Sequence, residues 1–168
     1  HIPFCETLCP YCSFHRYEYN KNIADKYFDA LQKELKMYKA HGYDFSGMYI
    51  GGGTPTISID RLIETIGFAK SLFKIKEISV ATNPNHLTVE KMDRLVGAGI
   101  NRLSVGVQTF DDKILKHIGR YEKYGSGEEI KDKIKSAVGR FDTLNVDLIF
   151  NIPLQTEDHL KKDLDIIE

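Results

Sequence analysis

Three observations on the sequence predict an α/β fold in which parallel strands alternate with helices. Short apolar segments rich in Ile, Val and Leu alternate with longer segments whose apolar residues recur every three or four positions. Glycine-containing turns separate the two kinds of segment, and no low-complexity linker divides the chain. This pattern is typical of βα units in one domain, whose strands pair in parallel and are covered by helices on at least one face.

The first half of the chain supplies the first of these units. Apolar residues at four-residue intervals over 22–39 predict an amphipathic helix, because they form one stripe on its surface. Residues 47–50 form a short apolar strand, three glycines follow at 51–53, and helical spacing resumes over 62–73. The β-rich run at 78–81 predicts the next strand.

The second half continues the same alternation. Asp111 has the side chain of a helix N-cap, and Ser126 with Glu129 has the spacing of a capping box. The predicted elements are a helix over 89–96 closed by Gly97, a strand over 102–107, a helix after Asp111, a helix from Ser126 to about Val138, a strand over 144–150 and a helix capped by Thr156. Roughly four and a half βα units are too few for an eight-unit barrel of ~250 residues, so we expect a partial barrel.

The strand over 102–107 predicts a polar interior for this partial barrel. Its apolar residues share one face, whereas Ser104 and Gln108 share the other, because side chains alternate along a strand. Asp147 lies between apolar residues of the last strand, and its carboxylate needs a partner because unpaired burial is costly. We expect these polar faces to line a lumen that binds a ligand.

The composition narrows the partners of the protein. The chain has 168 residues, with 23 Lys and Arg against 24 Asp and Glu, so its formal net charge is −1 at pH 7. This balance gives no basic excess for nucleic acid or for an anionic membrane surface. No apolar run approaches the ~20 residues of a membrane span, and the first residues lack the pattern of a signal peptide. We therefore expect a cytoplasmic protein with neither nucleic-acid nor membrane partners.

All three cysteines fall within one short segment, as Cys5, Cys9 and Cys12. An odd, local group of thiols predicts a metal site rather than a disulfide framework. Three thiolates on one loop are typical ligands for three irons of a cubane iron–sulfur cluster, which leaves the fourth iron open. The same spacing also admits zinc, with His15 as the fourth ligand of a closed site. Four other histidines lack ligand spacing and are expected at the surface or in the core: His41, His86, His117 and His159.

Five ordered motifs extend over essentially the whole chain. They are His1–Cys5, Cys9–Phe14, Tyr49–Thr56, Arg102–Phe110 followed by Gly119 and Arg120, and Asn145–Phe150 followed by Pro153 and Gln155. Together they resemble the radical S-adenosylmethionine (SAM) enzymes, and more narrowly the branch of oxygen-independent coproporphyrinogen III oxidase and its haem-chaperone relatives. The resemblance implies a TIM-like barrel of which residues 1–168 hold roughly the first five units, truncated at both ends and without the family's C-terminal domain.

The resemblance also implies cofactors and site residues. Cys5, Cys9 and Cys12 would ligate a [4Fe-4S] cluster whose open iron binds SAM, and reductive cleavage of SAM would yield a 5′-deoxyadenosyl radical. An electron donor such as flavodoxin or ferredoxin, and a small-molecule substrate that is a tetrapyrrole or haem, complete the implied system. The residues implied to contact SAM are Tyr11, Gly52, Gly53, Thr54, Gln108, Arg120 and Asp147. Without the resemblance, Arg120 is interpreted as a solvated charge at a helix end.

Two positions depart from the family pattern. Ala81 stands where the family usually has a glutamate that contacts SAM, and Asn83 lies on the same strand face as a partial substitute. The oxidase has a further cysteine just after its cluster motif, whereas this sequence continues with Ser13, Phe14 and His15, which favours the relatives of the oxidase. Three functions follow. We favour a radical SAM enzyme of tetrapyrrole or haem metabolism, and the alternatives are a haem chaperone with the same fold and a zinc-stabilised binding module.

Overall fold

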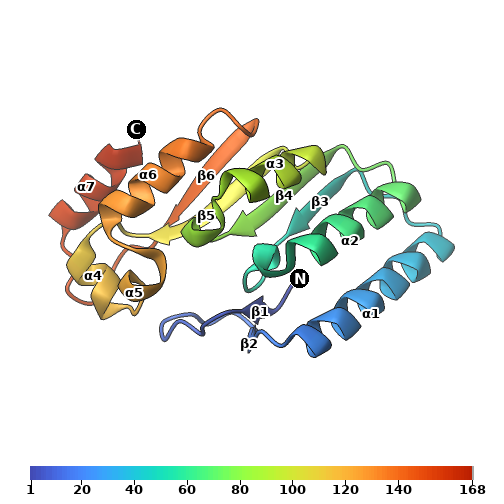
Figure 1. The fold of residues 1–168 in the computed structure, drawn as a ribbon, viewed down its shortest axis with the longest axis horizontal. Helices are drawn as coiled ribbons and strands as arrows, with labels where there is room; N and C mark the ends of the chain where they lie inside the picture. Colours follow the sequence, from blue (N-terminus) through green and yellow to red (C-terminus); the bar gives the residue numbers. More distant parts are fainter. Residues whose placement is uncertain (168) are drawn as a thin grey trace.

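The computed structural model describes residues 1–167 and shows a parallel sheet with helices packed on one of its faces (Figure 1). The main sheet has the strand order β3-β4-β5-β6, which are Gly47–Ile50, Glu77–Thr82, Arg102–Gln108 and Thr143–Leu148. A separate pair joins β1 (Phe4–Cys5) to β2 (Tyr17–Glu18), also in parallel. The helices are α1 (Lys21–Ala40), α2 (Ile59–Leu72), α3 (Val89–Gly97), α4 (Asp112–His117), α5 (Tyr121–Tyr124), α6 (Gly127–Ala137) and α7 (Glu157–Ile167), with the 3-10 turns η1 (Pro55–Ser58) and η2 (Pro84–His86).

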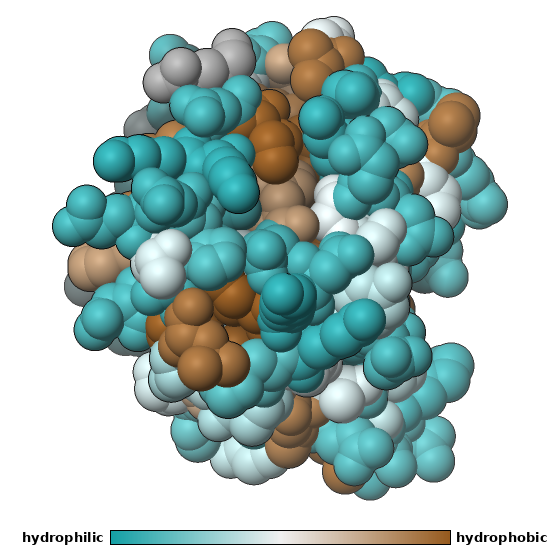
Figure 2. Space-filling view, turned by 90° about the vertical axis from the view of Figure 1, so that its left-hand side faces the viewer, coloured by the Kyte–Doolittle hydropathy of each residue, from teal (hydrophilic) through white to brown (hydrophobic). Residues whose placement is uncertain are grey.

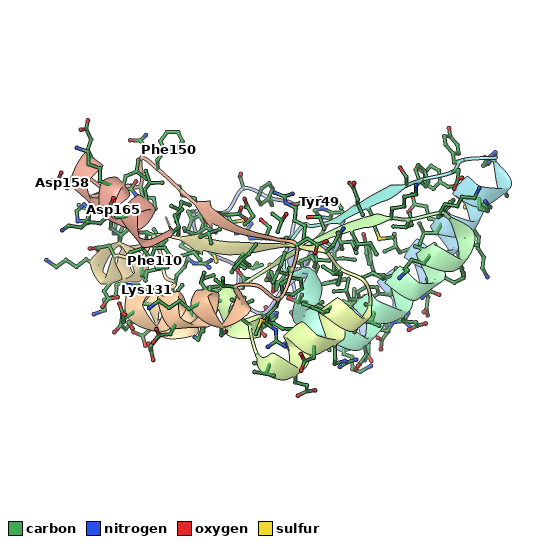
Figure 3. All side chains as sticks on the ribbon, turned by 90° about the horizontal axis from the view of Figure 1, so that it is seen from above. Tyr49, Phe110, Lys131, Phe150, Asp158 and Asp165 are labelled. Carbon is green, nitrogen blue, oxygen red and sulfur yellow. The ribbon has the colours of Figure 1, made fainter. Side chains whose placement is uncertain are left out.

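The core lies between the main sheet and its helices. In β4 the alternation is complete, because Ile78 and Val80 are buried toward the helices while Ser79 and Ala81 are half-buried on the other face. Figure 3 shows this second face from the side, with Tyr49 of β3 pointing away from the helices α2, α3 and α6. Large side chains that fill the core include Leu62, Ile66, Met92, Leu95, Leu103 and Ile130. Each such burial contributes about 1.5–3 kcal/mol, so the apolar residues fix which face of the sheet remains free.

The register of the strands aligns the polar residues of the free face. Ala81 of β4 pairs with Ser104 of β5, and Ser104 pairs in turn with Asn145 of β6. One step closer to the carboxyl ends of the strands, Gly106 pairs with Asp147. The polar face predicted for the strands is therefore present, and it is continuous across β5 and β6.

All the predicted elements are present, with ends that differ by a few residues. The cap predicted at Asp111 is confirmed, because its carboxylate accepts two backbone N–H groups of α4 at 2.9 and 3.0 Å. The capping box of Ser126 and Glu129 is also confirmed. The last strand ends at Leu148 rather than Phe150, because the neighbouring strand β5 also ends at that register position.

The surface of the described chain is mixed in character. Within residues 1–167, no helix is both long and apolar enough to cross a membrane. Figure 2 faces the end of the molecule where α4, α6 and α7 lie, and shows a mainly hydrophilic surface with scattered apolar side chains. Phe150 and Leu154, on the loop before α7, are among the most exposed apolar residues.

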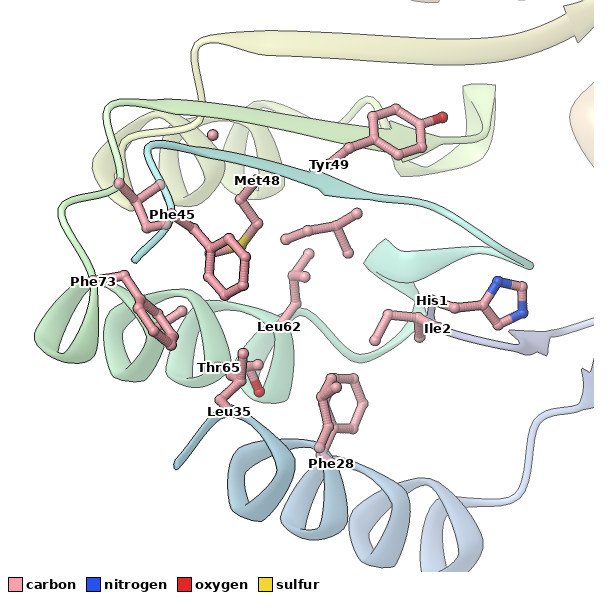
Figure 4. Close-up of a pocket in the computed structure, with 15 residues that line it drawn as sticks. His1, Ile2, Phe28, Leu35, Phe45, Met48, Tyr49, Leu62, Thr65 and Phe73 are labelled. Atoms are coloured by element: carbon pink, nitrogen blue, oxygen red, sulfur yellow. The ribbon is translucent and has the colours of Figure 1, made fainter. Parts of the chain in front are cut away.

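An apolar cavity of about 150 Å³ lies on the helix side of β3, between α1 and α2 (Figure 4). Its walls include Phe28 of α1, Leu62 of α2 and Met48 of β3. None of the residues that the sequence assigns to cofactor binding lines this cavity. The candidate site lies instead at the carboxyl ends of the strands, where parallel α/β proteins bind their ligands.

Candidate iron–sulfur and cofactor site

Cys5 is the last residue of β1, and Cys9 and Cys12 lie on the loop between β1 and β2, next to the carboxyl end of the main sheet. Ile2, just before β1, forms a parallel bridge with Gly52, just after β3. The backbone N–H of Cys12 donates to the carbonyl of Cys9 at 3.2 Å, which closes a tight turn within the loop. All three thiols are free: Cys5 is buried, and Cys9 and Cys12 are half-buried. The loop thus presents three unoxidised sulfur donors from one short segment.

Cys5 packs directly against the glycine turn that follows β3. Thr54 Oγ1 donates to Cys5 Sγ at 3.7 Å, and Asn83 Nδ2 donates to Thr54 Oγ1 at 2.8 Å. Burial raises the pKa of the Cys5 thiol, and the hydroxyl of Thr54 opposes that rise. A Cβ on Gly53 would lie 2.8 Å from Cys5 Sγ and 2.6 Å from the carbonyl oxygen of Phe4, so only glycine permits this contact.

Gly52 is required for two further reasons. Its φ of 125° lies in a region that residues with a Cβ rarely adopt, and a Cβ there would lie 2.7 Å from the carbonyl oxygen of Ile2. The N–H groups of Gly53 and Thr54 donate to Ile2 and Phe4 at 2.8 and 2.7 Å. The glycine turn that the sequence predicts as a binding loop therefore has a structural task as well, which is to seat the cysteine segment.

Arg120 is a buried cation between the cysteine loop and the sheet, with 2% of its surface exposed. Its guanidinium donates to the Tyr11 hydroxyl at 2.9 Å and to the Gly106 carbonyl at 2.5 Å. It also stacks on the ring of Tyr124, 4.0 Å from the centroid, and Nη1 lies 4.0 Å from Cys9 Sγ. The interpretation of Arg120 as a solvated charge is wrong, because the short helix α5 brings Tyr124 beneath it and excludes water.

Tyr11 shares this buried environment. Burial raises the pKa of Tyr11 to about 12, although the neighbouring Arg120 charge acts in the opposite direction. The phenol is therefore neutral at physiological pH and accepts the hydrogen bond of Arg120. Tyr11 covers one side of the cysteine loop and ties it to the guanidinium.

A second polar group occupies the free face of the sheet. Ser104 Oγ and Asn145 Nδ2 both donate to Asp147 Oδ1, at 3.0 and 2.7 Å. The expected burial of this carboxylate is wrong, because Asp147 is exposed on the free face, so the two hydrogen bonds orient it rather than offset a cost of burial. Gln108 lies against Gly106, the residue that pairs with Asp147, since a Cβ on Gly106 would be 2.9 Å from Gln108 Nε2. The carbonyl of Gly106 accepts from Arg120, which also donates to Tyr11 of the cysteine loop.

The sequence did not identify the residues that anchor Glu6, which belongs to the cysteine loop. Asn85 Nδ2 donates to Glu6 Oε2 at 3.2 Å, Lys123 Nζ lies 3.6 Å from the same oxygen, and His86 Nε2 lies 3.3 Å from Oε1. His86 is 3% exposed, and its Nδ1 is 2.6 Å from the hydroxyl of Thr56. No local pattern in the sequence links His86 to Glu6, because the contact joins segments that are far apart along the chain.

The donor set fits an anionic iron–sulfur cluster. The guanidinium of Arg120 contacts a phenol, a carbonyl, an aromatic ring and a thiol rather than a carboxylate, and its Nε has no hydrogen-bond partner among residues 1–167. A buried cation without a carboxylate is costly, and a negatively charged cluster on the three thiolates would offset that cost.

In the described chain, no three His, Cys, Asp or Glu side chains converge on a point that would hold a single metal ion. A cubane takes each thiolate on a different iron, so its ligands do not converge in that way.

A family model described as the Radical SAM superfamily matches residues 1–167 of the chain. The chain therefore belongs to the radical SAM superfamily, a class of proteins that implies a [4Fe-4S] cluster and SAM as cofactors.

Within that superfamily, the chain is similar to proteins of two kinds. It is 37% identical to the "Heme chaperone HemW" of Bacillus subtilis over 98% of this chain and 45% of that protein. It is 34% identical to the "Oxygen-independent coproporphyrinogen III oxidase" of Paracoccus denitrificans over 92% of this chain and 36% of that protein. The structure of coproporphyrinogen III oxidase (HemN) from Escherichia coli, a radical SAM enzyme, matches 99% of this chain and 40% of its own, with a TM-score of 0.86 and 30% identity.

These similarities confirm the predicted family, its branch and the partial radical SAM barrel. The chain spans less than half the length of the relatives it matches.

Proposed function

We propose that this chain is the cofactor-binding core of a radical SAM enzyme that acts on a tetrapyrrole or a related substrate. Cys5, Cys9 and Cys12 would hold the [4Fe-4S] cluster, with SAM on the open iron. When bound, these cofactors would supply reductive cleavage of SAM and hydrogen abstraction from a substrate. The observation that carries the proposal is the buried, carboxylate-free Arg120 beside three free thiols at the carboxyl end of the sheet.

The residues around the loop have separate tasks in this proposal. Arg120 offsets the negative charge of the thiolates, and the neutral Tyr11 covers the loop and shields it from water. Asp147, oriented by Ser104 and Asn145, accepts hydrogen bonds from the polar part of SAM on the free face of the sheet. The turn at Gly52, Gly53 and Thr54 and the side chain of Gln108 complete the SAM site.

The proposal is tested by product analysis. The protein is reconstituted anaerobically with iron and sulfide and reduced by dithionite or by flavodoxin, and 5′-deoxyadenosine and methionine are quantified after SAM is added. We expect both products in equal amounts, and none from a Cys12→Ala variant. Failure of the reconstituted wild-type protein to bind iron and sulfide would refute the proposal, and tight binding of zinc in their place would favour the zinc-stabilised module.

A haem chaperone is the second candidate function. It is supported by the 37% identity to a heme chaperone over 98% of this chain. Haem titration of the reconstituted protein, followed by absorption spectroscopy, separates the two candidates. Stoichiometric haem binding and transfer to an apo-haemoprotein, without turnover of a tetrapyrrole substrate, would favour the chaperone over the enzyme.

A further inference from the structure

The turn that follows β5 has a strained backbone at a residue of the proposed SAM site. Gln108 has a φ of 80°, although it carries a Cβ, and the pairing of β5 with β6 is irregular between Gly106 and Gln108. A residue other than glycine holds such a conformation only where the surrounding structure enforces it, and such positions cluster at functional sites. The elements that enforce it here are therefore part of what presents Gln108.

Three elements hold this turn. The backbone N–H of Ile149, after β6, donates to the carbonyl of Gln108 at 3.0 Å. On the other side, α6 packs so closely that a Cβ on Gly127 would lie 1.7 Å from the carbonyl oxygen of Phe110. From α7, the carboxylate of Asp163 accepts the backbone N–H of Phe110 at 2.8 Å. Figure 3 shows Phe110 between α7 and α6.

Asp163 is an unusual residue for this task. It is 2% exposed, and its second oxygen, Oδ2, has no hydrogen-bond partner among residues 1–167. Burial raises its pKa, and the N–H of Phe110 acts in the opposite direction. An apolar residue would cost less at a buried helix position, so the carboxylate is explained by the hydrogen bond that it makes to the turn.

We propose that Asp163 is a positioning residue, which locks the turn after β5 so that Gln108 presents its amide beside Gly106 to the cofactor. The two amides of Gln108 and Asn83 both border this glycine, since a Cβ on Gly106 would lie 2.9 Å from Gln108 Nε2 and 3.5 Å from Asn83 Oδ1. Within residues 1–167, Asp163 accepts a hydrogen bond from the backbone of Phe110, which is not itself a residue of the proposed SAM site. This inference rests on the proposed function for the role of Gln108, but the anchoring of the turn is measured separately.

The test uses three variants of the protein. Asp163→Ala removes the acceptor, Asp163→Asn retains an acceptor oxygen for the N–H of Phe110, and Asp165→Ala is the matched control at an exposed position of the same helix (Figure 3). Hydrogen exchange of the peptide that contains Phe110 reports the turn. Calorimetric titration of the reconstituted protein with SAM reports the site, and iron content verifies that the cluster is unaffected.

We expect Asp163→Ala to accelerate exchange at Phe110 at least tenfold and to weaken SAM binding about tenfold, with iron content unchanged. Asp163→Asn and Asp165→Ala should both behave like the wild type. Wild-type exchange in Asp163→Ala, or faster exchange with unchanged SAM affinity, would overturn the positioning role. If Asp163→Ala does not fold, Asp163→Ser, which keeps a polar group but shortens its reach, is measured in the same way. A wild-type protein that binds no SAM would contradict the proposed function, and the exchange comparison would still decide whether Asp163 holds the turn.

Discussion

Replacing Arg120 with methionine removes the positive charge beside the cysteine loop while most of the apolar stem remains. Arg120 Nη1 lies 4.0 Å from Cys9 Sγ, and unit charges at that distance interact by about 4 kcal/mol at an effective dielectric constant of about 20. A thiolate-bound cluster loses up to that stabilisation in Arg120→Met. The metal-free protein loses two hydrogen bonds but is relieved of a buried, unpaired charge, so we expect its stability to fall by only about 1 kcal/mol.

The rate at which a chelator removes iron measures how much Arg120 stabilises the bound cluster. After anaerobic reconstitution, the wild type should lose iron slowly and Arg120→Met at least tenfold faster. Arg120→Lys should be intermediate, because lysine keeps the charge but not the forked geometry that reaches both Tyr11 and Gly106. Urea unfolding of the metal-free proteins is the control for folding. Equal rates of iron loss in the wild type and a folded Arg120→Met would show that this cation does not stabilise the cluster.

Three further predictions concern the glycine turn, a buried histidine and the free face of the sheet. Gly53→Ala places a Cβ 2.6 Å from the Phe4 carbonyl oxygen, so it should destabilise the protein by about 1–3 kcal/mol in urea unfolding. The control is Gly67→Ala in α2, where a Cβ meets nothing within 4 Å; it should stabilise the protein by ~0.5–1 kcal/mol. Burial and the Lys91 charge lower the folded-state pKa of His86, although Glu6 acts in the opposite direction. The unfolded chain therefore takes up a proton before the folded protein does, so the free energy of unfolding should fall as the pH drops below about 6.5. A His86→Gln variant with the same pH dependence would contradict this. Ala81→Glu adds a carboxylate on the free face, opposite Ser104. It should tighten SAM binding about ten- to a hundredfold in calorimetry, because a hydrogen bond to a charged group contributes ~1.5–3 kcal/mol. Unchanged affinity would exclude a role for that position.

The sequence predicted the elements of the fold because their signals are local. The capping residues Asp111 and Ser126 depend on neighbours a few positions away, and both are found where expected. The helix predicted over 22–39 is also present, but its buried face is centred on Ala24 and Phe28, and Ile23 of the predicted stripe is exposed. The polar face of β5 followed from strand alternation in the same way. The end of β6 was not predicted correctly, because it depends on where the neighbouring strand β5 ends and not on the local sequence.

The contacts of the candidate site were predictable only in part. The cysteine spacing indicated a metal site directly, and the family motifs indicated Gln108, Arg120 and Asp147. Burial of Arg120 depends on Tyr124 of the short helix α5, which is not among the elements predicted from the sequence. The contacts of His86 with Glu6 and of Asp163 with Phe110 join segments 80 and 53 residues apart, so no periodicity or spacing reveals them.

The partners of the three glycines after β3 could not be predicted from the sequence either. Three consecutive glycines predict close approach of the backbone to something, but not to what. The structure shows that the nearest partners of Gly52 and Gly53 are the carbonyl oxygens of Ile2 and Phe4 and the sulfur of Cys5. The same residues therefore serve the seating of the cysteine loop and, in our proposal, the binding of SAM.

In our proposal, the three thiols hold a cluster with one iron open to SAM. Electron paramagnetic resonance of the reconstituted, reduced protein, recorded with and without SAM, tests it most directly. We predict a [4Fe-4S]⁺ signal whose g-values shift when SAM is added, and which is lost in Cys5→Ala, Cys9→Ala and Cys12→Ala alike. A cluster signal that SAM leaves unchanged would show that no iron is open to SAM, and a protein that retains zinc and forms no cluster would show that the thiols form a zinc site instead.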